Sequence, residues 1–126
     1  MGRAITWSMA KLNFDAQVLD VSKEALTDVQ SLVPTARTSQ VEGNEDIYKI
    51  IKEESPDVVI SSLPYHQTQG VGMWCIENNI RYCDLGGRVD VSHNINEYAK
   101  RVATKPVMTD LGLAPGWVNI LAEHGY

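Results

Sequence analysis

The sequence predicts an α/β protein built on a parallel sheet. Short apolar segments with strand character alternate with helical patterns of roughly ten residues along the whole chain. Elements in this rhythm form βαβ units with right-handed crossovers, which give a parallel sheet. Residues 57–64 form the clearest strand, and their three consecutive β-branched residues indicate burial on both faces.

The predicted elements are bounded by residues that start or stop them. Ser22 and Asn44 are good helix N-caps, and Pro34 and Pro56 end helices. We expect strands over residues 17–19, 38–42, 57–64, 80–85 and 106–108. We expect one helix that starts at Gly2, a second over residues 23–32 and a third from the Asn44 cap to Ser55. Further helices are expected over residues 67–79, in the segment that ends at Val102, and from Gly116 through Ala122.

Composition excludes several classes of partner. The 126 residues are 44% hydrophobic and 21% charged, with a net charge of −5, which indicates one soluble domain with a real core. The acidic balance argues against nucleic-acid or anionic-membrane binding. No apolar run approaches the length of a membrane helix, and no secretory leader is visible.

The tryptophans, the cysteines and the potential metal ligands are all interpreted as ordinary structural residues. Cys75 and Cys83 lack zinc-site spacing and are interpreted as small buried residues in a reducing, cytoplasmic setting. Asp90 and His93 lack a third ligand at matched spacing, so we predict no metal. We expect three tryptophans to pack in the core, with the last alternatively lining a substrate site: Trp7, Trp74 and Trp117.

The first 20 residues contain half of a nucleotide-binding motif. Gly2 opens a helix with apolar residues at helical spacing, and the strand over 17–19 ends at Asp20. This arrangement matches the last glycine of a G-x-G-x-x-G loop and the acid that binds the adenosine ribose. No strand and no first two glycines precede Gly2. The half-motif alone is weak evidence. Gly2 can also be an incidental residue after the first methionine, and Asp20 can be a solvated strand end.

Two further motifs, the first of which has two parts, extend the nucleotide-binding interpretation to nearly the whole chain. Residues 61–65 (Ser-Ser-Leu-Pro-Tyr) are followed by residues 79–87, which end in Asp-Leu-Gly-Gly, and residues 109–121 contain Asp-Leu-Gly-Leu-Ala-Pro-Gly-Trp-Val-Asn. Together they resemble the saccharopine dehydrogenase-like family, most closely its lysine 6-dehydrogenase branch. The resemblance implies a Rossmann-like, doubly wound parallel sheet and a pyridine-nucleotide oxidoreductase acting on the C–N bond of a lysine-like amino acid.

The resemblance also implies a set of cofactor-binding residues. Asp20 would accept from the ribose hydroxyls and repel a 2′-phosphate, which favours NAD, whereas Ser22 and Lys23 leave NADP as an alternative. Small residues at positions 61–64 would let backbone approach the second ribose and pyrophosphate. The predicted cofactor-binding residues are Gly2, Asp20, Val21, Ser22, Ser61, Ser62, Leu63, Pro64, Asp84, Gly86, Gly87, Pro115 and Gly116.

Structural explanations stay open for most of these residues. Residues 61–64 could be a plain strand-to-helix turn, and Gly86 with Gly87 could serve a turn that needs positive φ. Pro115 and Gly116 equally suit an ordinary helix start. No nucleophile stands beside a base, and the proton acceptor for the amine is expected in a second domain.

The resemblance finally predicts an incomplete domain. We expect an N-terminally truncated nucleotide-binding domain that lacks its first strand, without the family's C-terminal substrate domain, and by itself inactive. An amino-acid substrate would bind through that second domain, and homo-oligomer formation is left open. The alternatives are a non-catalytic dinucleotide-binding or regulatory module and an inactive fragment.

Overall fold

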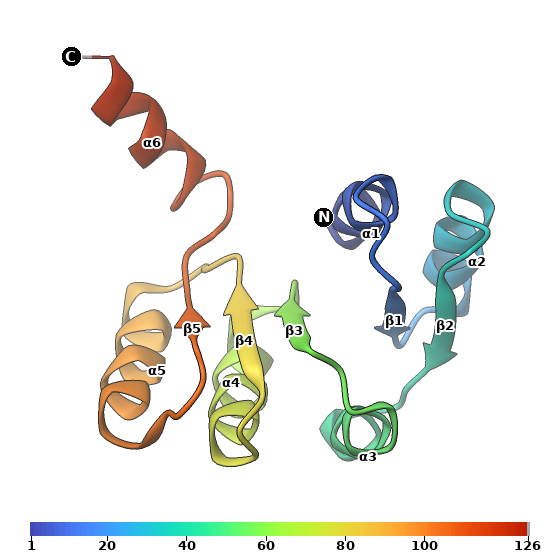
Figure 1. Ribbon diagram of the computed structural model, residues 1–126, viewed down its shortest axis with the longest axis horizontal. Coiled ribbons are helices and arrows are strands. Elements are labelled where there is room, and N and C mark those ends of the chain that lie inside the picture. Colours follow the sequence, from blue (N-terminus) through green and yellow to red (C-terminus); the bar gives the residue numbers. More distant parts are fainter. Residues whose placement is uncertain (126) are drawn as a thin grey trace. The chain divides into compact units, whose positions relative to one another are not determined.

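The computed structural model describes residues 1–125, in which helices and parallel strands alternate as predicted (Figure 1). The strands form a two-stranded sheet and a three-stranded sheet. The chain divides into two compact units, one from Met1 to Glu53 and one from Glu54 onward. Each sheet belongs to one unit, so each unit is described by itself.

The first unit is built on one parallel strand pair. β1 (Gln17–Asp20) pairs with β2 (Arg37–Gln40), with Asp20 opposite Gln40. α2 (Lys23–Leu32) packs on both strands, and α1 (Gly2–Lys11) packs on α2. α3 (Asn44–Glu54) follows β2. The buried cluster comprises Val29, Val33 and Ala36, with Ala10 and Val18 against it.

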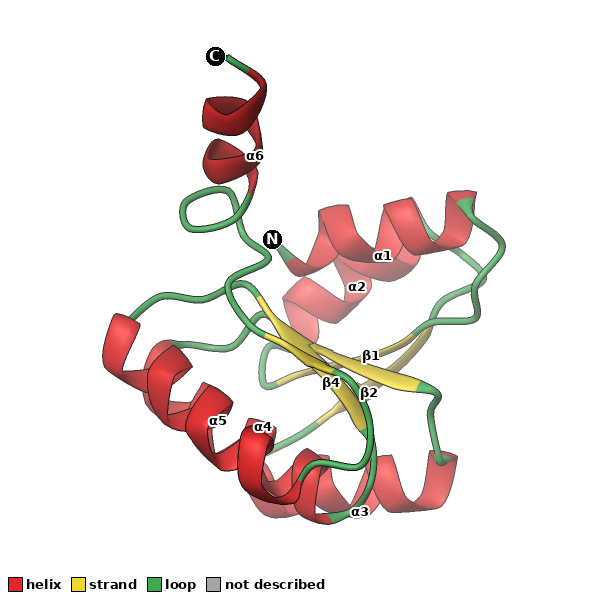
Figure 2. Ribbon diagram, turned by 60° about the vertical axis from the view of Figure 1, so that its left-hand side comes forward, coloured by secondary structure: helices red, strands yellow, loops and turns green. Residues whose placement is uncertain are grey.

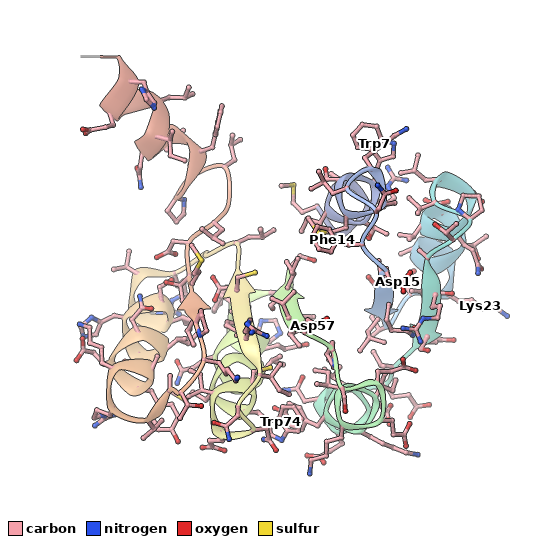
Figure 3. All side chains as sticks on the ribbon, in the orientation of Figure 1. Trp7, Phe14, Asp15, Lys23, Asp57 and Trp74 are labelled. Carbon is pink, nitrogen blue, oxygen red and sulfur yellow. The ribbon has the colours of Figure 1, made fainter. Side chains whose placement is uncertain are left out.

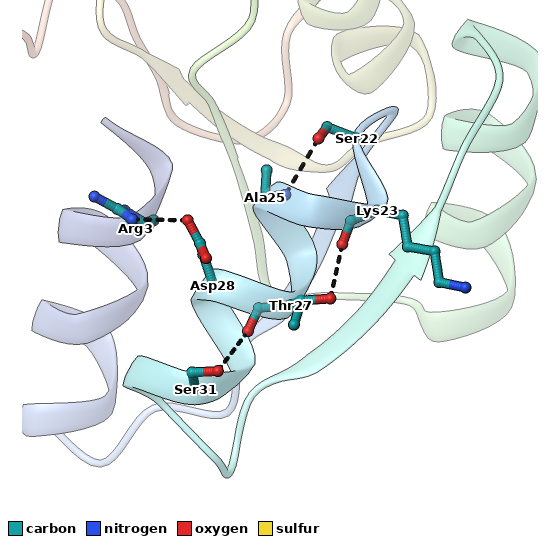
Figure 4. A network of polar contacts seen from close by, with 7 residues as sticks. All are labelled: Arg3, Ser22, Lys23, Ala25, Thr27, Asp28 and Ser31. Atoms are coloured by element: carbon teal, nitrogen blue, oxygen red, sulfur yellow. Dashed lines mark hydrogen bonds and ion pairs between the residues drawn. The ribbon is translucent and has the colours of Figure 1, made fainter.

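Side-chain hydrogen bonds fix α2 at its start and along its surface (Figure 4). The Ser22 hydroxyl accepts from the backbone N–H of Ala25 at 3.2 Å, which confirms the predicted N-cap. Arg3 donates to Asp28 at 3.0 Å and so links α1 to α2 at an exposed position. A single exposed ion pair of this kind contributes little to stability.

The start of α3 differs by one residue from the prediction. The helix begins at Asn44 itself, and the Gly43 carbonyl accepts from the N–H of Ile47 at 3.3 Å. The Asp46 carboxylate accepts from the backbone N–H of Glu42 at 2.8 Å. The acid in the first turn therefore binds back to the entering chain, and Asn44 is not the capping residue.

The second unit is a three-stranded parallel sheet covered by two helices. The order is β3 (Val58–Ser61), β4 (Arg81–Asp84) and β5 (Val107–Met108). α4 (Tyr65–Glu77) packs on β3 and β4, and α5 (Val89–Val102) lies along α4 (Figure 2). α6 (Trp117–His124) projects from the unit after β5 and buries none of its residues (Figure 1).

The core of this unit depends on a close helix-to-sheet approach. Val71, Cys75 and Ile76 of α4 are buried with Tyr82 of β4 and Ile95 of α5. A methyl group added at Gly72 would lie 3.0 Å from the Tyr82 ring and 3.2 Å from the Ile95 side chain. The absent side chain at Gly72 therefore lets α4 approach the ring. Burial of Cys75 confirms its prediction as a packing residue, whereas Cys83 is only half-buried.

Several expected core positions are exposed. β3 is not buried throughout as predicted, because Val58 is 44% exposed, the next two residues are half-buried and only Ser61 is buried. Trp7 is 46% exposed and projects from α1, with the Lys11 ammonium 5.4 Å from its ring (Figure 3). Trp117 is 53% exposed, and Trp74 is half-buried. Core packing was therefore wrongly predicted for Trp7 and Trp117.

Candidate nucleotide-binding site

The carboxyl ends of β3 and β4 carry two buried polar residues side by side. Ser61 stands opposite Asp84 in the strand register, and they are only 5% and 2% exposed. Oδ1 of Asp84 accepts from the backbone N–H of Gly86 at 2.8 Å and from that of Asp110 at 3.1 Å. The Asp84 carbonyl also accepts from the N–H of Leu111 at 2.9 Å. One aspartate therefore ties the loop after β4 to the loop after β5.

Glycines let these two loops approach each other. Gly86 has φ +75°, and a side chain there would meet the Asp110 carboxylate and lie 2.9 Å from the Pro115 ring. Gly116, with φ +122°, packs against the carbonyl of Gly112. The positive φ predicted for Gly86 and Gly87 is confirmed, at +75° and +151°, whereas that of Gly116 was not predicted. Gly112, which belongs to the same segment, is an additional close-approach position because it faces the Leu85 carbonyl.

Two buried oxygens at this edge have no hydrogen-bond partner within residues 1–125. They are Oγ of Ser61 and Oδ2 of Asp84. The neighbouring Tyr82 hydroxyl donates to the Thr68 carbonyl at 3.3 Å, and burial together with the Asp84 carboxylate raises the pKa of Tyr82. Buried polar atoms are almost always paired in folded proteins. The Tyr82 hydroxyl also interacts with the side chains of Ser61 and Asp84, so the two oxygens belong to a buried polar cluster at this edge.

The loop between β3 and α4 is held by a buried threonine. The Thr68 hydroxyl lies 3.1 Å from the Leu63 carbonyl and 3.2 Å from that of Pro64. α4 begins directly after Pro64, and no side chain caps its first turn. Ser62, on the same loop, is exposed. An uncapped helix start beside a small exposed residue can accept an anionic group such as a phosphate.

An open pocket of about 290 Å³ lies between the start of α5 and the loop after β5. Ser92 donates to Oδ1 of Asp110 at 2.7 Å, and Asn96 donates to the Thr109 hydroxyl at 2.9 Å. Arg88 makes two hydrogen bonds to Asp90, at 2.9 and 2.6 Å. The pocket is lined by Gly87, Arg88, Val89, Ser92, His93, Asn96, Asp110 and Pro115.

Most of the residues that line this pocket were missed by the sequence reasoning. Only Gly87 and Pro115 belong to the predicted set, because the prediction followed strand ends and known motifs. Ser92 and Asn96 are polar and one helical turn apart, on a helix whose apolar residue Ile95 faces inward. That spacing was the available signal. Asp110 could have been found as the acidic residue two positions after the last strand.

The first unit contains the remaining predicted residues. Gly2 is the first residue of α1, and Asp20 is the last residue of β1. Oδ1 of Asp20 accepts from the backbone N–H of Ser22 at 2.8 Å. Gln40 donates to the Val21 carbonyl at 3.0 Å. The loop after β1 is therefore fixed from both sides, with the Val21 side chain exposed.

Residues 1–125 contain neither a metal-binding cluster nor a helix suited to cross a membrane. No group of three or more histidine, cysteine, aspartate or glutamate side chains is placed to hold a metal ion in that range. Asp90 pairs with Arg88, and His93 lines the pocket beside α5. None of the described helices combines the length and apolarity that a bilayer crossing needs.

Comparison with solved structures identifies the fold. The chain is similar to the structure described as apo histidine-tagged saccharopine dehydrogenase (L-Glu forming) from Saccharomyces cerevisiae, with a TM-score of 0.74 and 18% sequence identity. The fold is Rossmann-like. The similarity covers 95% of this chain and 27% of the yeast chain, so this chain spans about a quarter of that enzyme's length. No protein-family model matches the sequence.

The structure brings the predicted residues of the second unit to one edge of their sheet. Residues 61–64 follow β3, Asp84 ends β4, and Gly86 contacts Pro115. The predicted residues of the first unit lie at the start of α1 and at the end of β1. Open α/β sheets bind their ligands beyond the carboxyl ends of the strands. The residue-level cofactor contacts stay predictions.

Proposed function

We propose that this chain is the dinucleotide-binding portion of an NAD(P)-dependent oxidoreductase. The observation that carries the proposal is the pair of unpartnered buried oxygens, Ser61 Oγ and Asp84 Oδ2, at the carboxyl ends of neighbouring parallel strands. In a Rossmann-like fold this edge is where a nucleotide binds. The exposed Ser62 and the uncapped start of α4, next to these oxygens, would bind a ribose hydroxyl or a phosphate.

Each part of a dinucleotide has candidate partners in the chain. Asp20 has one oxygen on Ser22 and a second available to a ribose hydroxyl, and its negative charge favours NAD over NADP. The uncapped start of α4 and the exposed Ser62 suit a phosphate. The loops that carry Gly86, Gly87, Pro115 and Gly116 are proposed to lie beside the nicotinamide.

The proposed reaction is oxidation or formation of a C–N bond in a lysine-like amino acid. Support comes from the resemblance of residues 61–65, 79–87 and 109–121 to saccharopine dehydrogenase-like enzymes, and from the yeast neighbour's name. The bound nicotinamide would accept or donate hydride. This chain would bind and orient the dinucleotide, and further chain, which the longer neighbour has, would supply most of the amino-acid site.

Fluorescence titration with NADH tests the proposal. The 126-residue chain is compared with a version that carries a strand and a Gly-x-Gly loop in front of Met1. Those additions supply backbone amides for the pyrophosphate, so we expect micromolar affinity for the longer version and nothing tighter than millimolar for the shorter one. No saturable binding to the folded longer version would refute the proposal. Micromolar binding to the shorter chain would instead favour a self-sufficient binding module.

A further inference from the structure

The last helix presents apolar side chains that the rest of the described chain leaves exposed. Five of the eight residues of α6 are apolar, and none of the eight is buried among residues 1–125. Trp117, Ile120 and Leu121 are each about half exposed, and Val118 is 41% exposed. Leu113, whose carbonyl accepts from the Val118 N–H at 3.0 Å, is 65% exposed. These five side chains, which we call the α6 surface, are of the kind that folded proteins bury.

The spacing of the residues gives α6 one continuous seam. Trp117, Ile120, Leu121 and His124 stand at i, i+3, i+4 and i+7, which places them along one side of the helix. The two aliphatic residues lie in the middle, with an indole ring at one end and an imidazole ring at the other. A seam of this kind is what one helix presents to another when two helices pack side by side.

An antiparallel pair of α6 helices brings complementary residues of the seam together. With a two-fold axis between positions 120 and 121, Ile120 of each copy meets Leu121 of the other. Trp117 of each copy then meets His124 of the other, so an aromatic contact forms at both ends of the seam. Both copies use the same residues, so the contact is isologous and closes at two molecules.

The charge of α6 favours the antiparallel over the parallel arrangement. The first turn contains no acidic residue, and Glu123 lies in the last turn. A helix is partly positive at its start and partly negative at its end, so Glu123 is unfavourable in its own helix. In an antiparallel pair Glu123 lies beside the first turn of the other copy, near Val118, where a carboxylate is favoured. A parallel pair would instead bring the two Glu123 carboxylates together.

Backbone hydrogen bonds hold the start of α6 in a fixed direction. The N–H of Trp117 donates to the Gly112 carbonyl at 2.9 Å, and that of Asn119 donates to the Gly116 carbonyl at 3.0 Å. Gly116 packs closely against the Gly112 carbonyl. A helix that is already oriented loses less conformational freedom when it pairs, which favours association.

The size of the α6 surface sets the strength of the contact. Five side chains that are each about half exposed present roughly 500 Å² per copy, or about 1,000 Å² for two copies, which is the lower limit for a specific interface. Interfaces of this size belong to weak, reversible complexes, so we expect a dissociation constant on the order of 100 µM.

From these features we propose that the α6 surface binds the same surface of a second copy of this chain. The product is a weak, symmetric dimer in which the two α6 helices run antiparallel. Its formation requires neither a nucleotide nor an amino acid. The dimer therefore goes beyond the proposed function, and either can fail without the other.

Sedimentation velocity of the 126-residue chain, from about 10 µM to about 1 mM, tests for the dimer. We expect the average mass to rise from that of one chain towards that of two. Amide NMR spectra of the ¹⁵N-labelled chain over the same range should show shifts that gather at residues 113 and 117–124. A mass of one chain throughout, or shifts confined to other residues, would overturn the proposal and leave α6 for a different partner.

Two variants that add the same charge separate the seam from the rest of the surface. Leu121→Glu places a carboxylate in the apolar seam, so we expect at least about tenfold weaker association. Val102→Glu adds it at the end of α5, at a valine that is 46% exposed, and association should be unchanged. Because α6 buries none of its residues, Leu121→Glu should stay folded. Equal association of the two variants would contradict the proposal.

A mixture of two variants tests the antiparallel register. Ile120→Lys and Leu121→Glu should each associate poorly alone, whereas their mixture places the lysine of one copy against the glutamate of the other. We expect the mixture to associate severalfold more strongly than either variant alone. A mixture of Ile120→Lys with Val102→Glu contains the same charges and should not recover. Failure of the first mixture to recover, or equal recovery in both, would contradict the antiparallel seam.

Discussion

The backbone N–H of Asp110 donates to the buried carboxylate of Asp84 over 3.1 Å, and the same carboxylate oxygen accepts from Gly86. One side chain at the end of β4 thus sets the path of two loops that are distant in sequence. The loops in turn place Pro115 against Gly86 and Asp110 against Ser92. The site edge of the second unit therefore depends on Asp84 as well as on its glycines.

Replacement of Asp84 tests this dependence. Asp84→Ala removes the acceptor for two backbone N–H groups, and we expect a loss of about 2–4 kcal/mol in the free energy of unfolding. Asp84→Asn keeps an acceptor oxygen and should lose clearly less. Urea-induced unfolding followed by circular dichroism measures both, with the exposed Asp57→Ala as a near-neutral control. Equal losses for the alanine and asparagine variants would contradict the acceptor role.

Alanine substitutions at Gly86 and at Gly43 form a matched pair of variants. Gly86→Ala places a methyl group against the Asp110 carboxylate and the Pro115 ring at φ +75°, so we expect a loss of at least about 1–2 kcal/mol. Gly43→Ala meets nothing within 4 Å and loses only the preference for glycine at the position before α3, so it should cost less than Gly86→Ala. Thermal unfolding of the two variants checks the contrast. A neutral Gly86→Ala would show that the two loops are not closely packed.

Ser22, which caps α2, and Ser31, which lies within α2, differ in role and give a second pair of matched variants. Ser22→Ala removes the cap on the N–H of Ala25 and should cost about 1 kcal/mol. Ser31 only bonds back to the Thr27 carbonyl within the helix, so Ser31→Ala should be neutral or slightly stabilising (Figure 4). The urea midpoints of unfolding measure both effects. A larger loss of stability for Ser31→Ala than for Ser22→Ala would contradict the capping assignment.

Alkaline pH should destabilise the protein through Cys75. Burial raises the pKa of this thiol from 9.0 to about 12, so the folded chain keeps a proton that the unfolded chain releases. Stability is then fully present below about pH 9 and falls as pH rises, by about 1 kcal/mol between pH 9 and pH 10. Cys75→Ala should flatten this slope in urea unfolding. Tyr82, whose pKa is also raised by burial, adds a further loss above about pH 10.

Local sequence signals predicted most elements but not their exposure. The Ser22 cap and the stop at Pro34 act within a few residues, and both are present in the structure. Burial of Val58, Trp7 and Trp117 depends on what lies beyond each element, and the apolar pattern alone could not reveal that. A β-branched run predicts a strand, but not whether both of its edges are paired.

The residues of the candidate site also differ in whether local sequence signals could predict them. Asp84, Gly86 and Gly87 were predicted because they follow a strand within one motif. Ser92 and Asp110 are 18 residues apart and meet only because α5 folds back beside the loop after β5. A contact of that kind follows from tertiary structure, which no short motif encodes.

Amide NMR mapping of NADH on the longer version, with the strand and Gly-x-Gly loop in front of Met1, tests dinucleotide binding most directly. The proposed site predicts saturable shifts that gather at the loop after β1, residues 20–22, and at the carboxyl ends of β3 and β4, residues 61–64 and 84–87. Asp20→Ala should weaken NADH more than NADPH, because the lost carboxylate binds a ribose and repels a 2′-phosphate. Saturable shifts confined to other surfaces, or none in a folded protein, would contradict dinucleotide binding at this edge.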